Sequence, residues 1–164
     1  MSKILHIARH AKSSWDYEDI SDIDRPLNPR GINNAYLMAR RFTEKNQLPD
    51  LLIASPANRA LHTAVIYARV LKLSWDKIVM NENIYMGYAE EIIQIIKSAD
   101  NKHDSIMLFG HNPTFTVLAN HFLKDQIDNI PTAGIVSITF KENEWEKIGN
   151  AAPQKVYFDY PKNI

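Results

Sequence analysis

Hydrophobic and polar positions follow two alternating patterns along the chain. Short apolar runs are typical of buried strands. They occur at Met1–Ala8, Asp50–Ala54, Ser105–Phe109, Gly134–Phe140 and Lys155–Tyr160. Longer segments separate the first four of these runs. In them apolar residues recur every three or four positions, which predicts amphipathic helices.

Helical spacing is clearest in four segments. They are Ile32–Phe42, Leu61–Leu71, Ala89–Ser98 and Thr114–Phe122. The first helix should begin at Asn28-Pro29, because asparagine caps helices well and proline fits the first helical position. We expect Ser13–Pro26 to be a polar loop, and Lys77–Gly87 to form a short strand plus a loop.

Repeated alternation of strand and helix predicts an α/β fold, a three-layer α/β/α sandwich. Its central sheet should be mostly parallel, with helices on both faces and the two late strands at one edge. The chain has 164 residues, 45% of them hydrophobic, which suits one domain over residues 1–164.

Composition excludes several classes of function. The 19 basic and 19 acidic side chains cancel, so no overall field draws the protein to nucleic acid or to an anionic membrane. Cysteine is absent, which rules out disulfides and thiolate metal sites. The first residues do not resemble a signal peptide, and no apolar run approaches the roughly 20 residues that span a bilayer. We expect a soluble, cytoplasmic protein.

Candidate chemistry lies where predicted strands end. Arg9-His10 follows the first strand, Ser55–Arg59 the second, and Gly110-His111 a later one. In parallel sheets, ligands bind beyond the carboxyl ends of the strands, so these segments should converge. Two arginines and two histidines at one rim would provide charged donors for a tetrahedral oxyanion.

In this order the motifs resemble those of the histidine phosphatase superfamily, also called phosphoglycerate mutase-like, and within it the SixA-type phosphohistidine phosphatases. The resemblance covers most of the chain. It rests on Arg9-His10 with Ser13, on Asp24–Gly31, on Ser55-Pro56 with Arg59 and Thr63-Ala64, and on Gly110–Pro113. The glycine that usually follows Arg-His in the family is here Ala11. Its backbone carbonyl can still orient the histidine.

The resemblance implies a catalytic role for His10, which would attack phosphorus through one ring nitrogen and form a transient phosphohistidine. The other nitrogen must then donate its proton to a fixed acceptor. Arg9, Arg59 and His111 would hold the phosphoryl oxygens and favour neutral His10 by like-charge repulsion. Ser13 and Arg25 are further candidate phosphate contacts, with a turn-stabilising role equally open for Ser13. Neither a metal nor another cofactor is implied.

The donor of a proton to the leaving group is open between two carboxylates. The larger family members use a glutamate, and Glu82 lies near its expected position. Asp22, in the loop before Pro26, competes equally. The other histidines, at positions 6, 62, 103 and 121, are expected to be packing or surface residues, and Lys12 and Arg30 to be solvated charges.

We therefore expect a metal-independent phosphohydrolase acting through His10, of the SixA type, on a phosphohistidine protein. A small phosphate ester is the other candidate substrate. The alternatives are a small-molecule phosphatase or mutase of the same superfamily, and a non-catalytic module that binds phosphate or phosphopeptides. A mutase is disfavoured because about 165 residues leave little room for a lid that excludes water.

Overall fold

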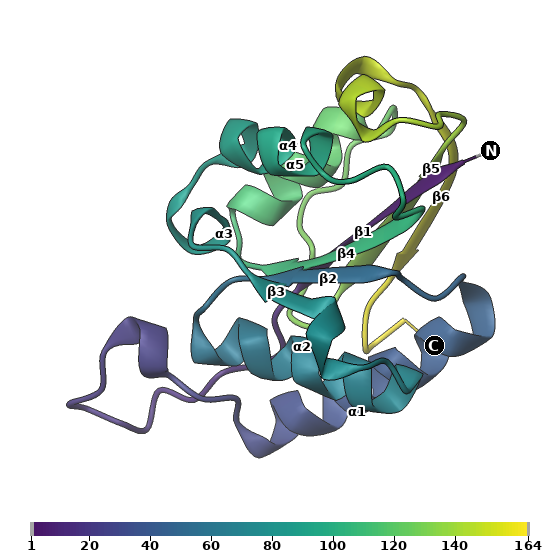
Figure 1. The fold of residues 1–164 in the computed structure, drawn as a ribbon. Coiled ribbons are helices and arrows are strands. Elements are labelled where there is room, and N and C mark those ends of the chain that lie inside the picture. The colour runs from purple at the N-terminus through teal and green to yellow at the C-terminus, as the bar shows by residue number, and fades with distance from the viewer. Residues whose placement is uncertain (1, 164) are drawn as a thin grey trace.

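In the described part of the chain, six strands form one mixed sheet at the centre of the protein (Figure 1). The computed structural model describes residues 2–163. The strands are β1 (Lys3–Arg9), β2 (Leu51–Ala54), β3 (Ile78–Met80), β4 (Ser105–Gly110), β5 (Ile135–Phe140) and β6 (Pro153–Asp159). Their order across the sheet is β3-β2-β4-β1-β5-β6. The first four are parallel, and β5 and β6 lie at one edge, as the sequence predicts. These two late strands pair antiparallel.

Helices cover both faces of this sheet, with α1 and α2 on one side and α3, α4 and α5 on the other (Figure 1). Their bounds are α1 Pro29–Lys45, α2 Asn58–Leu71, α3 Asn83–Met86, α4 Ala89–Lys97 and α5 Thr114–Phe122. The predicted α/β/α sandwich is therefore confirmed. Short 3₁₀ helices occupy Asp22–Asp24, Trp75–Lys77 and Trp145–Asn150.

Each face of the sheet has its own apolar core. Ala35, Ala39 and Phe42 of α1 pack with the α2 residues against one face, as their helical spacing predicts. Residues of α4 and α5, such as Ile92 and Leu118, pack against the other face. Burying this apolar surface is the main force that fixes the helices on the sheet.

Local signals set the start of α1. The side chain of Asn28 accepts the N–H of Gly31 at 2.7 Å, and Pro29 is the first helical residue. The predicted cap is confirmed. The region Lys77–Gly87 contains one more element than expected, because the four-residue helix α3 follows β3.

No helix within residues 2–163 is long and apolar enough to cross a membrane.

Candidate active site

Three strand ends meet around one pocket of about 240 Å³. His10 follows β1, Arg59 lies in the first turn of α2 after β2, and His111 follows β4. Pairing of the parallel strands brings these ends together, since Arg9 lies opposite Gly110 and Ala54 opposite Phe109. The pocket is lined by Arg9, His10, Lys12, Ser13, Trp15, Arg25, Arg59, His111, Asn112 and Thr132.

The backbone fixes the tautomer of His10. Its Nδ1 lies 2.7 Å from the carbonyl oxygen of Ala11. A carbonyl can only accept a hydrogen bond, so neutral His10 carries its proton on Nδ1 and keeps a lone pair on Nε2. The N–H of Ala11 donates to Thr63 Oγ1 at 3.1 Å, and the Thr63 hydroxyl donates to the carbonyl of Arg59 at 2.7 Å. Helix α2 thereby holds the loop that orients the histidine.

His10 is neutral because it is buried. Burial is the largest cause that lowers its pKa to about 3, and the hydrogen bond to Ala11 acts in the opposite direction. Electrostatic interactions with His111, Arg59 and Arg9 lower the pKa further. Like-charge repulsion therefore acts in the direction that the sequence predicts, but desolvation is the larger effect.

A serine fixes the tautomer of the second histidine. His111 Nε2 lies 2.8 Å from Ser55 Oγ, which also accepts the N–H of Ala57 at 3.1 Å. Within the described residues the Ser55 hydroxyl has no acceptor other than His111 Nε2. Burial lowers the pKa of His111 to about 4, so the ring is neutral and carries its proton on Nδ1.

Buried donors without partners gather at this pocket. Within residues 2–163 they include Nε of Arg9, Nε of Arg59 and Nδ1 of His111. Leaving a buried donor unsatisfied costs about 1–3 kcal/mol, and more for a charged group. A bound oxyanion would supply acceptors, so the arrangement suits a tetrahedral anion such as phosphate.

Asp22 is bound to the arginines around the pocket and does not line it. Its carboxylate accepts hydrogen bonds from Tyr85 Oη at 2.6 Å, from Arg59 Nη2 at 3.0 Å and from Arg25 Nε at 3.2 Å. The bond from Tyr85, followed by those from Arg59 and Arg25, lowers the pKa of Asp22 to about 2. At neutral pH this carboxylate is ionised and has no proton to give.

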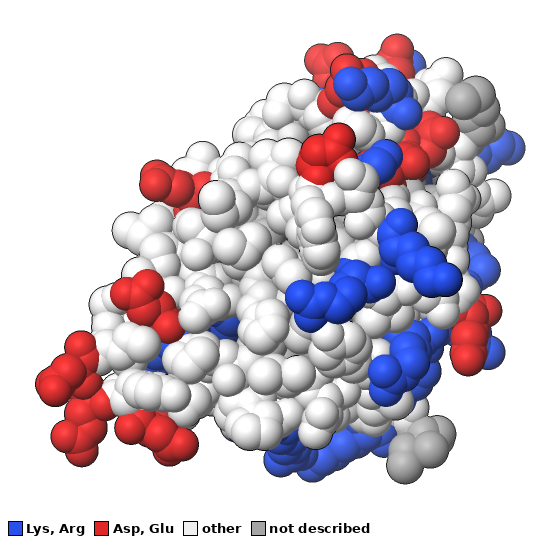
Figure 2. Space-filling model, turned by 60° about the horizontal axis from the view of Figure 1, so that its bottom comes forward, with Lys and Arg blue, Asp and Glu red and all other residues white. Residues whose placement is uncertain are grey.

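The segment between β1 and α1 forms the mouth of the pocket. Arg25 Nη1 donates to Ser13 Oγ at 3.0 Å, and the Arg25 guanidinium lies 3.6 Å from the centre of the Trp15 indole. Beyond this stack the segment is acidic, and Figure 2 shows Asp and Glu side chains gathered at the end where the segment projects in Figure 1. The positive pocket is thus bordered by an acidic surface.

Glu82, the other candidate acid, is not part of the hydrogen-bonded cluster around Asp22. It is exposed, directly precedes α3, and is not among the residues that line the pocket. Tyr85, one turn further on, contacts the site instead, with its ring centroid 5.4 Å from that of His111.

Three residues that support the site are not among the predicted site residues: Ser55, Thr63 and Tyr85. For two of them, the position in the sequence could have indicated a role. Ser55 directly follows β2, where polar groups reach the rim, and Thr63 lies four residues after Arg59, on the same helix face. Tyr85 had no such indication, because its contact with Asp22 joins residues 63 positions apart.

The remaining histidines lie outside the pocket. His6 is buried in β1, where its ring nitrogens lie 2.6 Å from Ser137 Oγ and 3.0 Å from Ser105 Oγ. His121 is exposed on α5 and bonds to the carbonyl of Gly149 at 2.8 Å. Within the described chain, no group of three His, Asp or Glu side chains is arranged to hold a metal ion.

A known family model matches the part of the chain that contains much of this site. Residues 5–87, which include Arg9, His10 and Arg59, match the family model of the histidine phosphatase superfamily (branch 1). The chain belongs to this superfamily. This histidine phosphatase is 28% identical over 155 residues to a chloroplastic, uncharacterized protein of Arabidopsis thaliana, a match that covers 90% of the chain and 71% of the relative.

Solved structures share the fold of this histidine phosphatase. The protein histidine phosphatase SixA in complex with tungstate superposes with a TM-score of 0.81 at 22% identity, covering 96% of this chain and 97% of the other. A mutant phosphoserine phosphatase of Entamoeba histolytica bound to phosphoserine gives 0.66 at 15% identity, with coverages of 94% and 96%. Family membership makes the chain a phosphatase.

Proposed function

We propose that this phosphatase needs no metal, forms a covalent phosphohistidine at His10, and acts on phosphohistidine side chains of proteins. The observation that carries the proposal is the bond from His10 Nδ1 to the Ala11 carbonyl, which leaves the Nε2 lone pair for attack on phosphorus. The low pKa of His10 keeps that lone pair free at neutral pH.

In the first step His10 Nε2 attacks phosphorus, and the bond from phosphorus to the leaving group breaks with its electron pair on the leaving group. Arg9, Arg59 and His111 donate to the phosphoryl oxygens through donors that have no other partner within residues 2–163. In the second step water attacks phospho-His10. The nitrogen–phosphorus bond breaks, its electron pair returns to Nε2, inorganic phosphate leaves, and the proton from water passes to solvent.

Within residues 2–163 no aspartate or glutamate lines the pocket, which favours a phosphohistidine substrate. Asp22 is ionised, because hydrogen bonds from Tyr85 and the arginines hold its pKa near 2, and Glu82 is exposed outside the pocket lining. A phosphoryl group on a protonated imidazole can leave a neutral imidazole behind without a proton from the enzyme. The SixA neighbour, described as a protein histidine phosphatase, agrees with this choice.

A small phosphate ester is the second candidate substrate. The pocket of about 240 Å³ is large enough for a single phosphate group with a short alkyl or aryl part. The phosphoserine bound to the Entamoeba histolytica neighbour belongs to this class. An aliphatic alcohol is a poor leaving group without an acid, so we expect such esters to react more slowly than phosphohistidine.

The proposal also covers location. We place the enzyme in the cytoplasm, because the chain has no cysteine and a reducing compartment makes disulfides dispensable. Cell fractionation tests this point, and recovery of the protein outside the cytoplasm would contradict it.

One substrate screen tests the proposed function. Phosphohistidine proteins, phosphoserine and phosphotyrosine peptides and small phosphate esters are incubated with the wild type in the presence of a chelator, with phosphate release as the readout. His10→Ala is the blank, and His121→Ala, an exposed histidine elsewhere, is the matched control. We expect the highest kcat/KM on phosphohistidine and none in His10→Ala. Equal slow release by the wild type and His10→Ala would contradict enzymatic action through His10, and a non-catalytic or mutase role would then need testing.

A further inference from the structure

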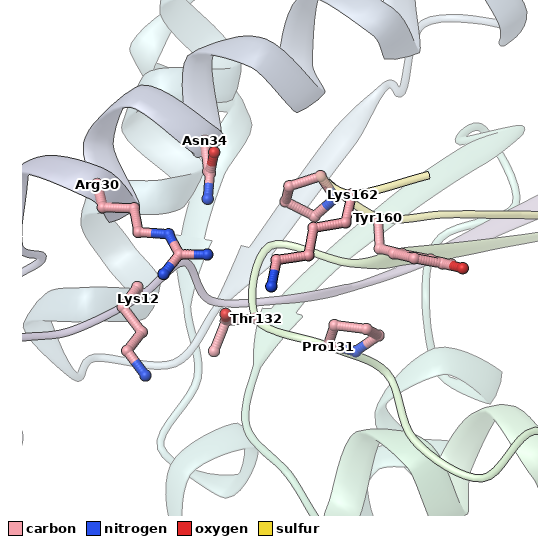
Figure 3. A pocket seen from close by; sticks show the side chains of 8 residues that line it. Lys12, Arg30, Asn34, Pro131, Thr132, Tyr160 and Lys162 are labelled. Carbon is pink, nitrogen blue, oxygen red and sulfur yellow. The ribbon is translucent and has the colours of Figure 1, made fainter. Parts of the chain in front are cut away.

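A second cavity opens beside the pocket of His10 (Figure 3). Its volume is about 340 Å³, and we call it the basic cavity. It is lined by Lys12, Arg30, Asn34, Pro131, Thr132, Tyr160, Pro161 and Lys162. Lys12 and Thr132 line both cavities, so the two are adjacent and a single ligand could reach from one to the other.

Three cations from distant parts of the chain surround the basic cavity. Lys12 follows β1, Arg30 lies in the first turn of α1, and Lys162 follows β6. In Figure 3 the guanidinium of Arg30 and the ammonium of Lys162 point toward the same space beside Thr132, with Lys12 next to Arg30. Within residues 2–163 no acidic residue lines the cavity, and none of the three cations forms an ion pair.

This placement of charge is unfavourable in the free protein. Neighbouring cations repel one another, and Arg30 lies at the positive end of the α1 dipole, where anions are favoured and cations are not. The first turn of α1 contains no acidic residue that would offset this charge. A bound anion would be attracted by the three cations and by the start of α1, and this attraction would offset their mutual repulsion.

The backbone holds Lys12 at the border between the two cavities. The Lys12 carbonyl accepts the N–H of Asn28 at 3.0 Å, which ties the loop to the start of α1. A β-carbon on Gly31 would overlap that carbonyl oxygen, so a glycine is required for this close approach. The position of Lys12 relative to Arg30 is therefore built into the fold.

We propose that the basic cavity binds a second anionic group of the substrate, a phosphate or a carboxylate, while the reacting phosphoryl group lies at His10. Thr132 and Asn34 add neutral hydrogen-bonding groups to the three cations. The proposal rests on the proposed function for the reacting end of the substrate. It adds that substrates with two separated negative groups are preferred over those with one.

Two matched substrate series distinguish the sources of the second anion. The first pairs alkanediol bisphosphates of increasing length with the monophosphates of the same alcohols. The second pairs phosphohistidine peptides that carry glutamate near the phosphohistidine with peptides that carry glutamine there. For each pair the readout is the ratio of kcat/KM for the doubly charged member to that for its partner.

We expect this ratio to be about 10 or more in at least one series, because each charge-assisted hydrogen bond changes affinity by about that factor. Arg30→Ala/Lys162→Ala should bring the ratio close to one. The matched control Arg40→Ala/Lys124→Ala, which removes two exposed cations elsewhere, should leave the ratio unchanged. Raised salt should also lower it, because exposed charges are screened.

A ratio near one in both series, or a ratio that survives Arg30→Ala/Lys162→Ala, would overturn the proposal. A protein without phosphatase activity gives a different result, since the wild type would then hydrolyse no member of either series. Calorimetric binding of the bisphosphates to the His10→Ala protein tests the basic cavity in that case. If the bisphosphates bind more tightly than the monophosphates, and the difference disappears when Arg30→Ala/Lys162→Ala is added, the result would support anion binding in the basic cavity. Equal binding of the two kinds of ligand would overturn the proposal.

Discussion

His10 Nδ1 lies 2.7 Å from the carbonyl oxygen of Ala11, so a backbone acceptor in the next residue selects the tautomer of the proposed nucleophile. The side chain of residue 11 takes no part in this bond. Alanine can therefore stand where the family usually has glycine without loss of the orienting contact.

This relationship predicts the behaviour of Ala11→Gly. We expect kcat/KM to stay within about threefold of the wild type, since the carbonyl is retained, and the free energy of unfolding to fall by about 1 kcal/mol because glycine loses more chain entropy on folding. Steady-state kinetics and denaturant titration measure the two effects. A rise in activity of tenfold or more would mean that the alanine methyl group obstructs the pocket.

The pH dependence of activity follows from the neutral state of His10. Its pKa is lowered to about 3, chiefly by burial, so the nucleophilic form predominates above that pH and is lost as the pH falls through about 3. The pKa of His111 is lowered to about 4 for the same reason. We predict that kcat/KM, corrected for ionisation of the substrate, is flat above pH 5 and declines only below it. Circular dichroism at each pH separates this decline from unfolding, and an acid limb between pH 6 and 7 would show that the histidine titrates at its ordinary pKa.

Substitution of the two candidate acids tests which residue, if either, protonates the leaving group. Asp22→Asn should leave the pH profile of kcat unchanged and raise KM a few-fold, because Arg59 and Arg25 lose the partner that positions them. Glu82→Gln should change neither parameter. General acid catalysis is worth about 10²- to 10⁴-fold, so a loss of that size in kcat on an alkyl phosphate would identify either residue as the acid.

Oxyanion binding measures the contribution of Arg59. Arg59→Ala should weaken binding of tungstate or vanadate by about 1.5–3 kcal/mol, roughly 10- to 150-fold, because a charge-assisted contact is removed. Isothermal titration calorimetry gives the affinity directly. Arg40→Ala, an exposed arginine on α1, serves as the control. Unchanged affinity in Arg59→Ala would mean that the oxyanion binds elsewhere.

Much of the fold and part of the site can be predicted from the chain because their causes are local. Asn28 and Pro29 mark the start of α1 through their own capping chemistry. The meeting of His10, Arg59 and His111 follows from parallel strands whose carboxyl ends share one edge. Predicting these features requires only local sequence signals and the order of the strands and helices along the chain.

The rest depends on contacts between segments far apart in the sequence. Asp22 binds Arg59 and Tyr85 because its loop folds back over α2, which no periodicity in the loop indicates. Lys12 and Arg30 are exposed, as predicted, but the basic cavity arises only because the chain after β6 returns Lys162 to the same place. The size of the desolvation effect on His10 likewise depends on packing that spacing alone does not give.

Trapping of the covalent intermediate tests the account most directly. The enzyme is mixed with a phosphoramidate, quenched in alkali, which preserves phosphohistidine, and digested for mass spectrometry. We predict a phosphoryl group on the peptide that contains His10, attached through Nε2, and none in His10→Ala. A phosphorylated peptide from another part of the chain, or continued turnover of substrate by His10→Ala, would contradict it.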